Sequence, residues 1–276
     1  MDSSGGLLIK NYLSNMQVDI TLAGYTKCFT DWHDIDYTPA YNKFYLIYAG
    51  EGWLRIGGRD YYPRPGQLFL MPGGVKQSYG AINENTFLKH WCHFTASVGD
   101  MNLFDLIRTP YFIDVENNDL PRLRELFENL LENYSGGDMA SVLKAKASIY
   151  SILACFLDGC GSVPVSSPES PAAEKLDTVL RYIETHLSGD ITVEELARTV
   201  YLHPNYFIRF FKRHLGCAPM HYIKGLRLEK ARTLLAGSAM PVKEIALATG
   251  FKDLFHFSKS IKSYTGFSPS ELRRAR

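Results

Sequence analysis

The last hundred residues of the chain contain the same unit twice. Residues 193–197 (VEELA) correspond to residues 242–246 (VKEIA), 49 positions later. Further on, six positions correspond at an offset of 50: Phe207/Phe257, Arg209/Lys259, Phe211/Ile261, Lys212/Lys262, Gly216/Gly266 and Pro219/Pro269. Each copy predicts a short helix, a tight turn, a second helix that carries Arg or Lys, and a glycine stop. This is the pattern of a helix-turn-helix, which presents its second helix to a DNA major groove.

The second helix of each copy is predicted to have a core face and a DNA face. The apolar positions recur at four-residue spacing, which places on one side Phe207, Phe211, Phe257 and Ile261. Arg209 and Lys259 hold equivalent places on the other side. An arginine there can donate two hydrogen bonds to one guanine, and a lysine does so less rigidly. Two copies in one chain predict that one protomer reads two successive grooves.

Seven further residues of these two helices are candidates for DNA contact. Asn205 in the first turn of the first helix can read adenine. At the start of the second helix lie Leu254, Phe255 and His256, and the first two either touch a thymine methyl group or pack internally. Cations expected at phosphates are Lys212, Arg213 and Lys262. A purely solvated basic face would account for any one of these cations, but it does not predict the repeat.

Charge is distributed unequally between the two halves of the chain. Residues 1–173 carry 13 Lys and Arg against 19 Asp and Glu, and residues 174–276 carry 17 against 10. The first part therefore has a net charge of −6 and the second of +7. A basic C-terminal half beside an acidic N-terminal half indicates that only the C-terminal half meets a polyanion.

The N-terminal half predicts a barrel followed by helices. Residues 20–95 contain short strand patterns separated by turns, including a Gly57-Gly58 hairpin, which is typical of a small β-barrel or jelly roll. From residue 101 the spacing becomes helical in two stretches, around 120–134 and 142–156, with Asp138 as a cap between them. These two helices either cover the barrel or form a dimer seam, and both roles are compatible.

A boundary between the halves is marked twice. The segment 159–173 (GCGSVPVSSPESPAA) is rich in Pro, Ser and Gly, and the charge balance changes at the same place. We therefore expect an N-terminal domain over 1–160, a linker over 161–173 and an all-α DNA-binding domain over 174–276. The predicted fold class is α+β, with an N-terminal cupin-like β-barrel, flanking helices and two C-terminal helix-turn-helix motifs.

The C-terminal motifs resemble the AraC-type bacterial transcription regulators. The resemblance covers residues 174–276 and is carried by EIALATGFKDLFHFSKSIKSYTGFSPSELR at 244–273. Four positions depart from that pattern. Tyr201 stands where the first turn usually has glycine, Phe255 and His256 replace the usual Ser and Tyr, and Lys259 replaces a common Arg. The resemblance implies sequence-specific DNA binding, with activation commoner than repression, and the departures affect the target sequence.

The N-terminal half is similar to the sensor domain of the same family. The run GEGWLRIGGRDYYPRPGQLFLMP at 50–72 and HWCHF at 90–94 resemble its ligand-binding barrel. In arabinose-responsive members a Tyr and a Trp line the sugar pocket, and Tyr79 and Trp91 fall at those places, with Lys89 or His90 beside them. Aromatic faces with a few polar groups suit a sugar. The resemblance implies a small-molecule effector, a carbohydrate being one candidate, a homodimer, and contact with RNA polymerase.

Other classes of protein are disfavoured by the sequence. We expect no enzyme, no metal and no cofactor, because the three barrel histidines lack the spacing of a metal set and no phosphate loop or nucleophile elbow occurs. No apolar stretch of about 18 residues is evident, which predicts no membrane span. The N-terminus lacks a signal peptide, and five scattered cysteines indicate a reducing cytoplasm. Two alternatives stay open, a DNA-binding protein without an effector and, less favoured, a metal-dependent cupin enzyme.

Overall fold

The computed structural model describes residues 12–161 and 171–274. The chain divides into two compact units, Met16–Ser166 and a C-terminal unit of Ser167–Arg276 that also takes Met1–Asn15. Helix α5 (Pro171–Thr185) begins inside the expected 161–173 linker, whose residues 162–170 lie outside the described part. Tyr12, the first described residue, belongs to the C-terminal unit and is buried.

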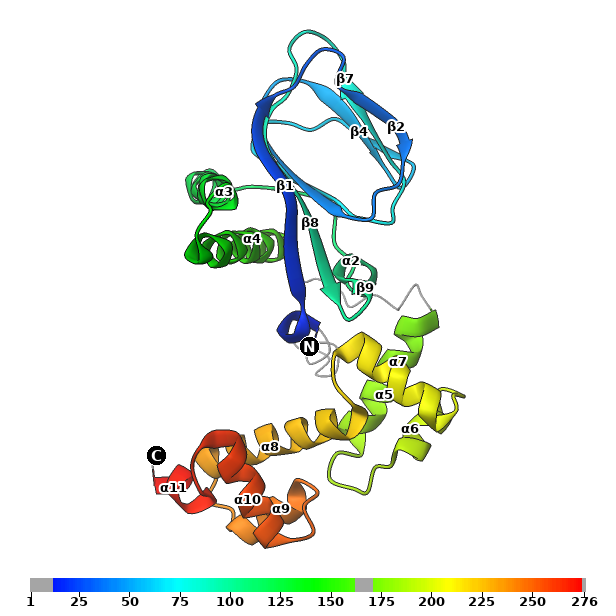
Figure 1. Cartoon of the computed structure of the whole chain (residues 1–276), viewed down its shortest axis with the longest axis vertical. Coiled ribbons are helices and arrows are strands. Elements are labelled where there is room, and N and C mark those ends of the chain that lie inside the picture. Colours follow the sequence, from blue (N-terminus) through cyan, green and yellow to red (C-terminus); the bar gives the residue numbers. More distant parts are fainter. Residues whose placement is uncertain (1–11, 162–170, 275–276) are drawn as a thin grey trace. The chain divides into compact units, whose positions relative to one another are not determined.

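The N-terminal unit is built from two antiparallel sheets (Figure 1). The larger sheet has the order β1 (Gln17–Lys27), β8 (Leu88–Val98), β3 (Asn42–Ala49), β6 (Gln67–Met71) and β10 (Phe112–Asp114), with β9 (Met101–Asn102) beside β8. The smaller sheet has the order β2 (His33–Tyr37), β7 (Gln77–Ala81), β4 (Gly52–Ile56) and β5 (Arg59–Tyr61). The core lies between them and includes Ile47, Leu54, Ile56, Phe69 and Phe87.

The predicted hairpin is confirmed, but two strands are longer than expected. Gly57 and Gly58 turn β4 into β5 with φ of 57° and 82°, left-handed values that glycine adopts without a Cβ clash. Strands β1 and β8 each have 11 residues and pair along almost their whole length, with a bulge between Ile20 and Leu22. Residues on β8 alternate in burial, since successive side chains point to opposite faces of the sheet.

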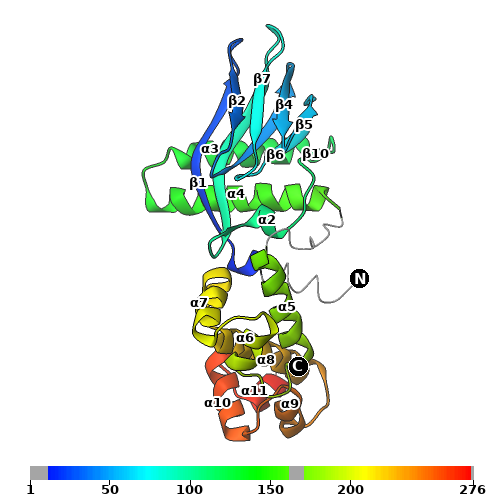
Figure 2. The same cartoon turned by 90° about the vertical axis from the view of Figure 1, so that its right-hand side faces the viewer.

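Two helices pack on each other and against the larger sheet (Figure 2). They are α3 (Leu120–Tyr134) and α4 (Met139–Gly159), and Asp138 caps α4 by accepting a 2.9 Å hydrogen bond from the Ser141 N–H. Phe156 of α4 is fully buried, and its ring centroid lies 5.3 Å from that of Phe44 on β3. The predicted covering role of these helices is therefore confirmed. The dimer seam stays a prediction.

Helix α4 corrects the expectation that no long apolar stretch exists. An 18-residue window of Met139–Gly159 reaches a mean hydropathy of 1.4, so by length and composition this helix is apolar enough to cross a membrane. The sequence pattern concealed this because Lys144 and Lys146 interrupt it. In the structure Lys146 forms a 2.7 Å ion pair with Asp19 of β1, and the apolar side of α4 is packed on the barrel.

The C-terminal unit is helical from α5 to the end of its described part. The first motif is α6 (Val193–Thr199) with α7 (Pro204–Leu215), and the second is α9 (Val242–Ala248) with α10 (Leu254–Thr265). Between the motifs runs α8 (Pro219–Gly237), and α11 (Pro269–Arg274) follows the second motif. Thr192 and Glu195 form a capping box at the start of α6.

The turns of the two motifs repeat the same backbone geometry. Leu202 N–H donates to the Ala197 carbonyl at 2.9 Å, and Phe251 N–H donates to the Ala246 carbonyl at 2.8 Å. Each turn contains one left-handed residue, Tyr201 at φ 56° and Gly250 at φ 78°. The sequence departure at Tyr201 therefore leaves the turn intact but places a residue with a Cβ in a conformation that disfavours one.

Replacement of Tyr201 by glycine should stabilise the first motif. The Tyr201 side chain is 96% exposed, so its removal forfeits no packing. Relief of the left-handed strain, set against the greater chain entropy of glycine, leaves a gain of roughly 0.5–1 kcal/mol. Native-state hydrogen exchange of the Leu202 amide measures the change, and a faster exchange in Tyr201→Gly would contradict it.

The matched substitution in the second motif should act in the opposite direction. A Cβ on Gly250 would lie 2.9 Å from the Leu187 carbonyl oxygen and 2.8 Å from the Arg227 guanidinium carbon. Gly250→Ala therefore adds steric conflict to the strain and should destabilise the turn by roughly 2 kcal/mol. Exchange of the Phe251 amide is the corresponding measurement.

Candidate DNA interface and ligand cavity

Helices α7 and α10 bury one side and expose the other in the same register. Phe207 and Phe211 of α7, and Phe257 and Ile261 of α10, are fully buried as predicted. Both helices end at a left-handed glycine, whose N–H donates to a carbonyl four residues back: Gly216 to Lys212 at 2.8 Å and Gly266 to Lys262 at 2.9 Å. The internal repeat thus extends from sequence to packing and caps.

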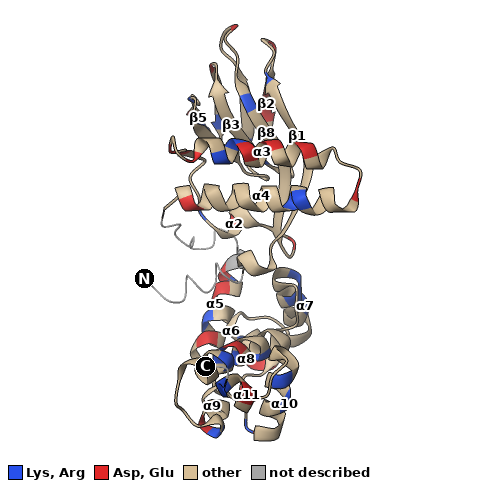
Figure 3. Cartoon of the chain, turned by 90° about the vertical axis from the view of Figure 1, so that its left-hand side faces the viewer, with Lys and Arg blue, Asp and Glu red and all other residues tan. Residues whose placement is uncertain are grey.

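All nine residues predicted to contact DNA are exposed on these two helices. They are Asn205, Arg209, Lys212 and Arg213 on α7, and Leu254, Phe255, His256, Lys259 and Lys262 on α10. Figure 3 marks Lys and Arg in blue along both helices. Because these long cations are exposed opposite a buried face, this arrangement suits contact with phosphates and base edges.

The first turn of α10 presents apolar side chains to solvent. Leu254 is 44% exposed and Phe255 is 77% exposed, so internal packing does not account for Phe255. Asp253 caps this turn by accepting hydrogen bonds from the Phe255 and His256 N–H groups at 2.9 and 3.2 Å. The cap fixes the direction of the helix start, and Phe255 is free to meet an apolar group such as a thymine methyl.

Arg227 of α8 joins the two motifs through backbone carbonyls. Its Nε donates to Leu187 at 2.9 Å and its Nη2 to Gly189 at 2.6 Å, both in the segment before α6. Its Nη1 donates to Gly250 in the turn of the second motif at 3.2 Å. One planar guanidinium therefore satisfies acceptors in the segment before the first motif and in the turn of the second. Nothing in the sequence pattern indicated this residue.

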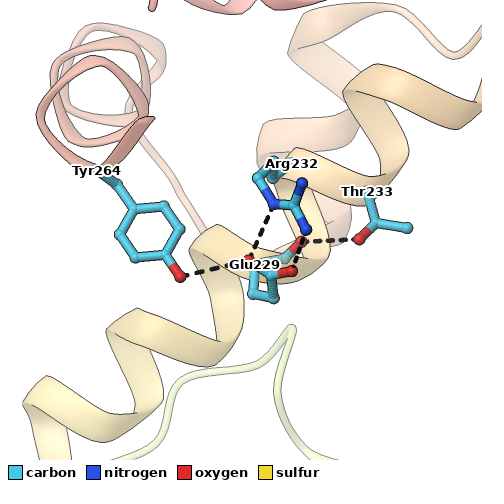
Figure 4. Close-up of polar contacts among 4 residues, drawn as sticks. All are labelled: Glu229, Arg232, Thr233 and Tyr264. Carbon is cyan, nitrogen blue, oxygen red and sulfur yellow. Dashed lines mark hydrogen bonds and ion pairs between the residues drawn. The ribbon is translucent and has the colours of Figure 1, made fainter. Parts of the chain in front are cut away.

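A second polar cluster holds α10 against α8 (Figure 4). The Tyr264 hydroxyl of α10 donates to Glu229 of α8 at 3.3 Å. Arg232 donates to the same carboxylate at 2.5 and 3.0 Å, and the pKa of Glu229 is lowered chiefly by this hydrogen bond. The cluster is largely exposed, so its contribution to stability is small.

Loss of the Arg227 guanidinium should loosen the second motif. Arg227→Met leaves three backbone carbonyls without these donors. We expect the opening free energy of α9 amides, from native-state hydrogen exchange, to fall by roughly 2–3 kcal/mol. Arg232→Met on the same helix is the control and should have a smaller effect. Equal losses in the two variants would show that the carbonyl contacts of Arg227 add nothing.

The N-terminal unit contains a cavity of about 210 Å³ between its two sheets. Aromatic rings form most of its wall, from Trp32, Tyr45, Tyr79 and Trp91. Trp32 stacks on Tyr79 with ring centroids 4.5 Å apart, and the Trp91 indole N–H donates to the Thr26 hydroxyl at 3.1 Å. Of the four ligand-binding residues predicted, Tyr79, Lys89 and Trp91 line this cavity.

His90, the fourth predicted residue, faces away from the cavity. Its ring stacks on Phe127 of α3 with centroids 5.5 Å apart, and its Nδ1 lies 2.6 Å from the Tyr48 hydroxyl. Neighbouring residues on a strand point to opposite faces, so Lys89 and His90 cannot share one site. The same alternation places the His93 side chain on the cavity side of β8. Counting alternate residues from Lys89 could therefore have identified His93 from the sequence.

The two β8 histidines should make the barrel unit less stable in acid. Burial lowers the pKa of His90 from 6.5 to about 4, helped by the Arg124 charge. The pKa of His93 also falls to about 4, through burial and the Lys43 and Lys89 charges. The unfolded chain protonates these histidines below pH 6.5, whereas the folded unit protonates them only near pH 4. Their contribution to the free energy of unfolding is therefore full above pH 6.5 and is lost as the pH falls from 6.5 to 4.

Each histidine should contribute roughly 2 kcal/mol of stability loss between pH 7 and pH 5. Urea unfolding followed by tryptophan fluorescence measures it, because Trp32, Trp53 and Trp91 are all in this unit. His90→Gln keeps a neutral acceptor for Tyr48 and should remove about half of the pH dependence. An unchanged pH dependence in that variant would count against this assignment.

No group of three or more His, Cys, Asp or Glu side chains is placed to hold a metal ion within the described residues. The cavity wall itself contains one histidine, His93, and one thiol, Cys28. The arrangement offers ring faces, hydroxyls and one ammonium group, which bind an organic ligand rather than coordinate a metal.

Comparisons with known proteins agree with both halves of this description. Residues 19–153 match the AraC-like ligand binding domain, and residues 196–275 match a helix-turn-helix domain. The arabinose operon regulatory protein of Escherichia coli (strain K12) is 25% identical over 233 residues, which cover 83% of this chain and 78% of the relative. The raffinose operon regulator RafR of Pediococcus pentosaceus is 27% identical over 217 residues, or 77% and 76% of the two chains.

One similar solved structure is the C-terminal domain of AraT, a response regulator from Geobacillus stearothermophilus. It is 32% identical to this chain, the match covers 40% of this chain and 89% of that one, and the TM-score is 0.36. The two curated relatives are transcription regulators, not enzymes. Because both domain matches occur in one chain and in the expected order, the chain belongs to the AraC-type family of DNA-binding transcription regulators with an N-terminal ligand-binding domain.

Proposed function

We propose that α7 and α10 read two successive major grooves of double-stranded DNA. The observation that carries this is the equivalence of Arg209 and Lys259, exposed on the same side of two helices whose opposite sides are buried. In this proposal Arg209 and Lys259 contact guanines and Asn205 contacts an adenine. Lys212, Arg213 and Lys262 contact phosphates, and Leu254, Phe255 and His256 meet base edges in the second groove.

The barrel cavity is proposed to bind the effector, a small molecule with carbohydrate character. Its volume of about 210 Å³ is below the roughly 300–1,000 Å³ of pockets for drug-sized ligands, which favours a ligand of monosaccharide size. Ring faces of Tyr79 and Trp91 suit the C–H faces of a sugar, and Thr26 and Lys89 supply polar contacts. Two relatives are named for arabinose and raffinose operons, which supports the carbohydrate class.

Effector binding would regulate transcription by favouring one arrangement of the DNA-binding unit over another. Activation through RNA polymerase is the mode we propose, supported by a relative named as the lactose operon transcription activator of Staphylococcus xylosus. Because the target is chromosomal DNA, we place the protein in the cytoplasm.

A homodimer through α4 completes the proposal. The side of α4 turned from the barrel exposes Met139 (90%), Val142 (56%) and Leu143 (70%), an apolar surface that a second copy would cover. Sedimentation of the full chain tests it: Leu143→Glu should shift the protein toward monomer, and a monomeric parent protein would contradict the proposal.

The deciding experiment is selection of genomic DNA fragments by the full-length protein at physiological salt, followed by footprinting. We expect protection of two successive major grooves on one face of the duplex, repeated for a dimer. Weak binding with equal affinity for all sequences, in the presence and absence of carbohydrates, would contradict base reading by both motifs.

Substitutions on α7 should separate base contacts from phosphate contacts. Arg209→Ala should lose about 1–3 kcal/mol of discrimination at one base pair, because a bidentate contact to guanine is removed. Lys212→Ala should weaken binding to all sequences alike and lower the salt slope by about 1. Quantitative footprinting at two salt concentrations measures both effects.

The control is Lys144→Ala, which removes an exposed cation of α4 in the other unit. It should leave DNA affinity and its salt dependence unchanged. If Arg209→Ala behaves like Lys212→Ala, then Arg209 is a phosphate contact and the assignment of base contacts is wrong.

A further inference from the structure

The barrel cavity contains a buried cation. Lys89 is 3% exposed and lines the cavity wall. Its ammonium nitrogen lies 3.7 Å from the ring centroid of Trp32 and 3.7 Å from that of Tyr45. Such ring faces attract a cation through their quadrupoles, but they supply no negative charge. The ammonium group is therefore held in the cavity without being neutralised.

No carboxylate neutralises this lysine from the protein side. No Asp or Glu carboxylate of the described residues lies within 4.0 Å of the Lys89 ammonium nitrogen. The Cys28 thiol forms a side-chain hydrogen bond with it. A second buried lysine, Lys43, lies behind Tyr79, with its ammonium nitrogen 4.9 Å from that ring centroid.

These two amines make the cavity wall favourable to an anion, which stabilises their protonated forms. Burial lowers the pKa of Lys89 to about 7 and that of Lys43 to about 8, and the two ammonium groups repel each other. An unpaired ammonium group in a buried site costs free energy, and a ligand that carries the opposite charge recovers part of it. A neutral sugar offers Lys89 a hydroxyl acceptor and leaves its charge unpaired.

We propose that the effector is a carbohydrate acid, whose carboxylate pairs with the Lys89 ammonium group while its ring lies against the aromatic wall. This inference rests on the proposed effector function of the same cavity. Thr26 and Tyr79 also line the cavity and carry hydroxyl groups that suit the ligand's own hydroxyl groups, and the one lysine in the wall, Lys89, matches a single carboxylate. The cavity thus selects for charge at one end of the ligand and for an apolar ring face along its side.

A matched pair of sugars tests the proposal. D-galacturonate and D-galactose differ at one carbon, where the first carries a carboxylate and the second a hydroxymethyl group. Tryptophan fluorescence of the full-length protein reports binding, because Trp32 and Trp91 line the cavity. We expect galacturonate to bind at least tenfold more tightly than galactose, and acetate to compete with it.

Variants of the two buried lysines locate the contact. Lys89→Met should weaken galacturonate at least tenfold and leave galactose unchanged within threefold, and Lys89→Gln, which is polar and uncharged, should do the same. Lys43→Met, which removes the second cation behind Tyr79, should weaken galacturonate less than Lys89→Met does. Lys76→Met is the control, since Lys76 is exposed and does not line the cavity, and it should change binding by less than threefold. In the absence of ligand, Lys89→Met should raise the midpoint of thermal unfolding, because a buried unpaired charge is removed.

Three results would overturn the proposal. Equal affinity for galactose and galacturonate would show that the cavity does not require a carboxylate on its ligand, while the proposed effector function would still hold. Retained galacturonate binding in both Lys89 variants would remove the assignment to Lys89. A fluorescence signal unmoved by galacturonate, galactose and acetate would also overturn it, and a wider panel of neutral carbohydrates then decides the effector function separately.

Discussion

The geometry of the DNA-binding unit depends on one guanidinium group. Arg227 donates to Leu187 and Gly189 before the first motif and to Gly250 in the turn of the second. Two recognition helices can read two grooves only if their separation and tilt are fixed before DNA arrives, since ordering them on binding would subtract from affinity. Helix α8 runs between the two motifs and separates them. Arg227 of α8 donates the hydrogen bonds that hold the segment before the first motif and the turn of the second to this helix.

In the barrel unit the buried Lys89 ammonium group lies between two aromatic rings and beside the Cys28 thiol, with no carboxylate of the described residues within 4.0 Å. Alternation along β8 sends Lys89, Trp91 and His93 to the cavity and His90 toward α3. The first set makes a polar, aromatic wall with room for a ligand, and the second makes an apolar contact with the covering helix. A single strand thus contributes one face to the cavity wall and the other to the contact with α3.

Repeated helical spacing allowed much of the C-terminal unit to be predicted from sequence. Phe207 and Phe257 marked the buried sides, and glycine at 216 and 266 marked the ends, because these signals are local. Long-range contacts could not be predicted in this way. Arg227 lies 40 positions from Leu187 and 23 from Gly250, and no periodicity relates them. His90 was misplaced because a family resemblance was followed where strand alternation separated it from Lys89.

The left-handed backbone of Tyr201 makes the turns of the two helix-turn-helix motifs differ in strain, although their hydrogen bonding is the same. Tyr201 holds a strained backbone and, at 96% exposure, gains no burial in return, whereas Gly250 occupies the same place without strain. The first turn therefore starts closer in free energy to its open form. On warming, the turn of the first motif should therefore open before that of the second, and in the proposed complex with DNA α10 would be the last of the two helices to leave its groove.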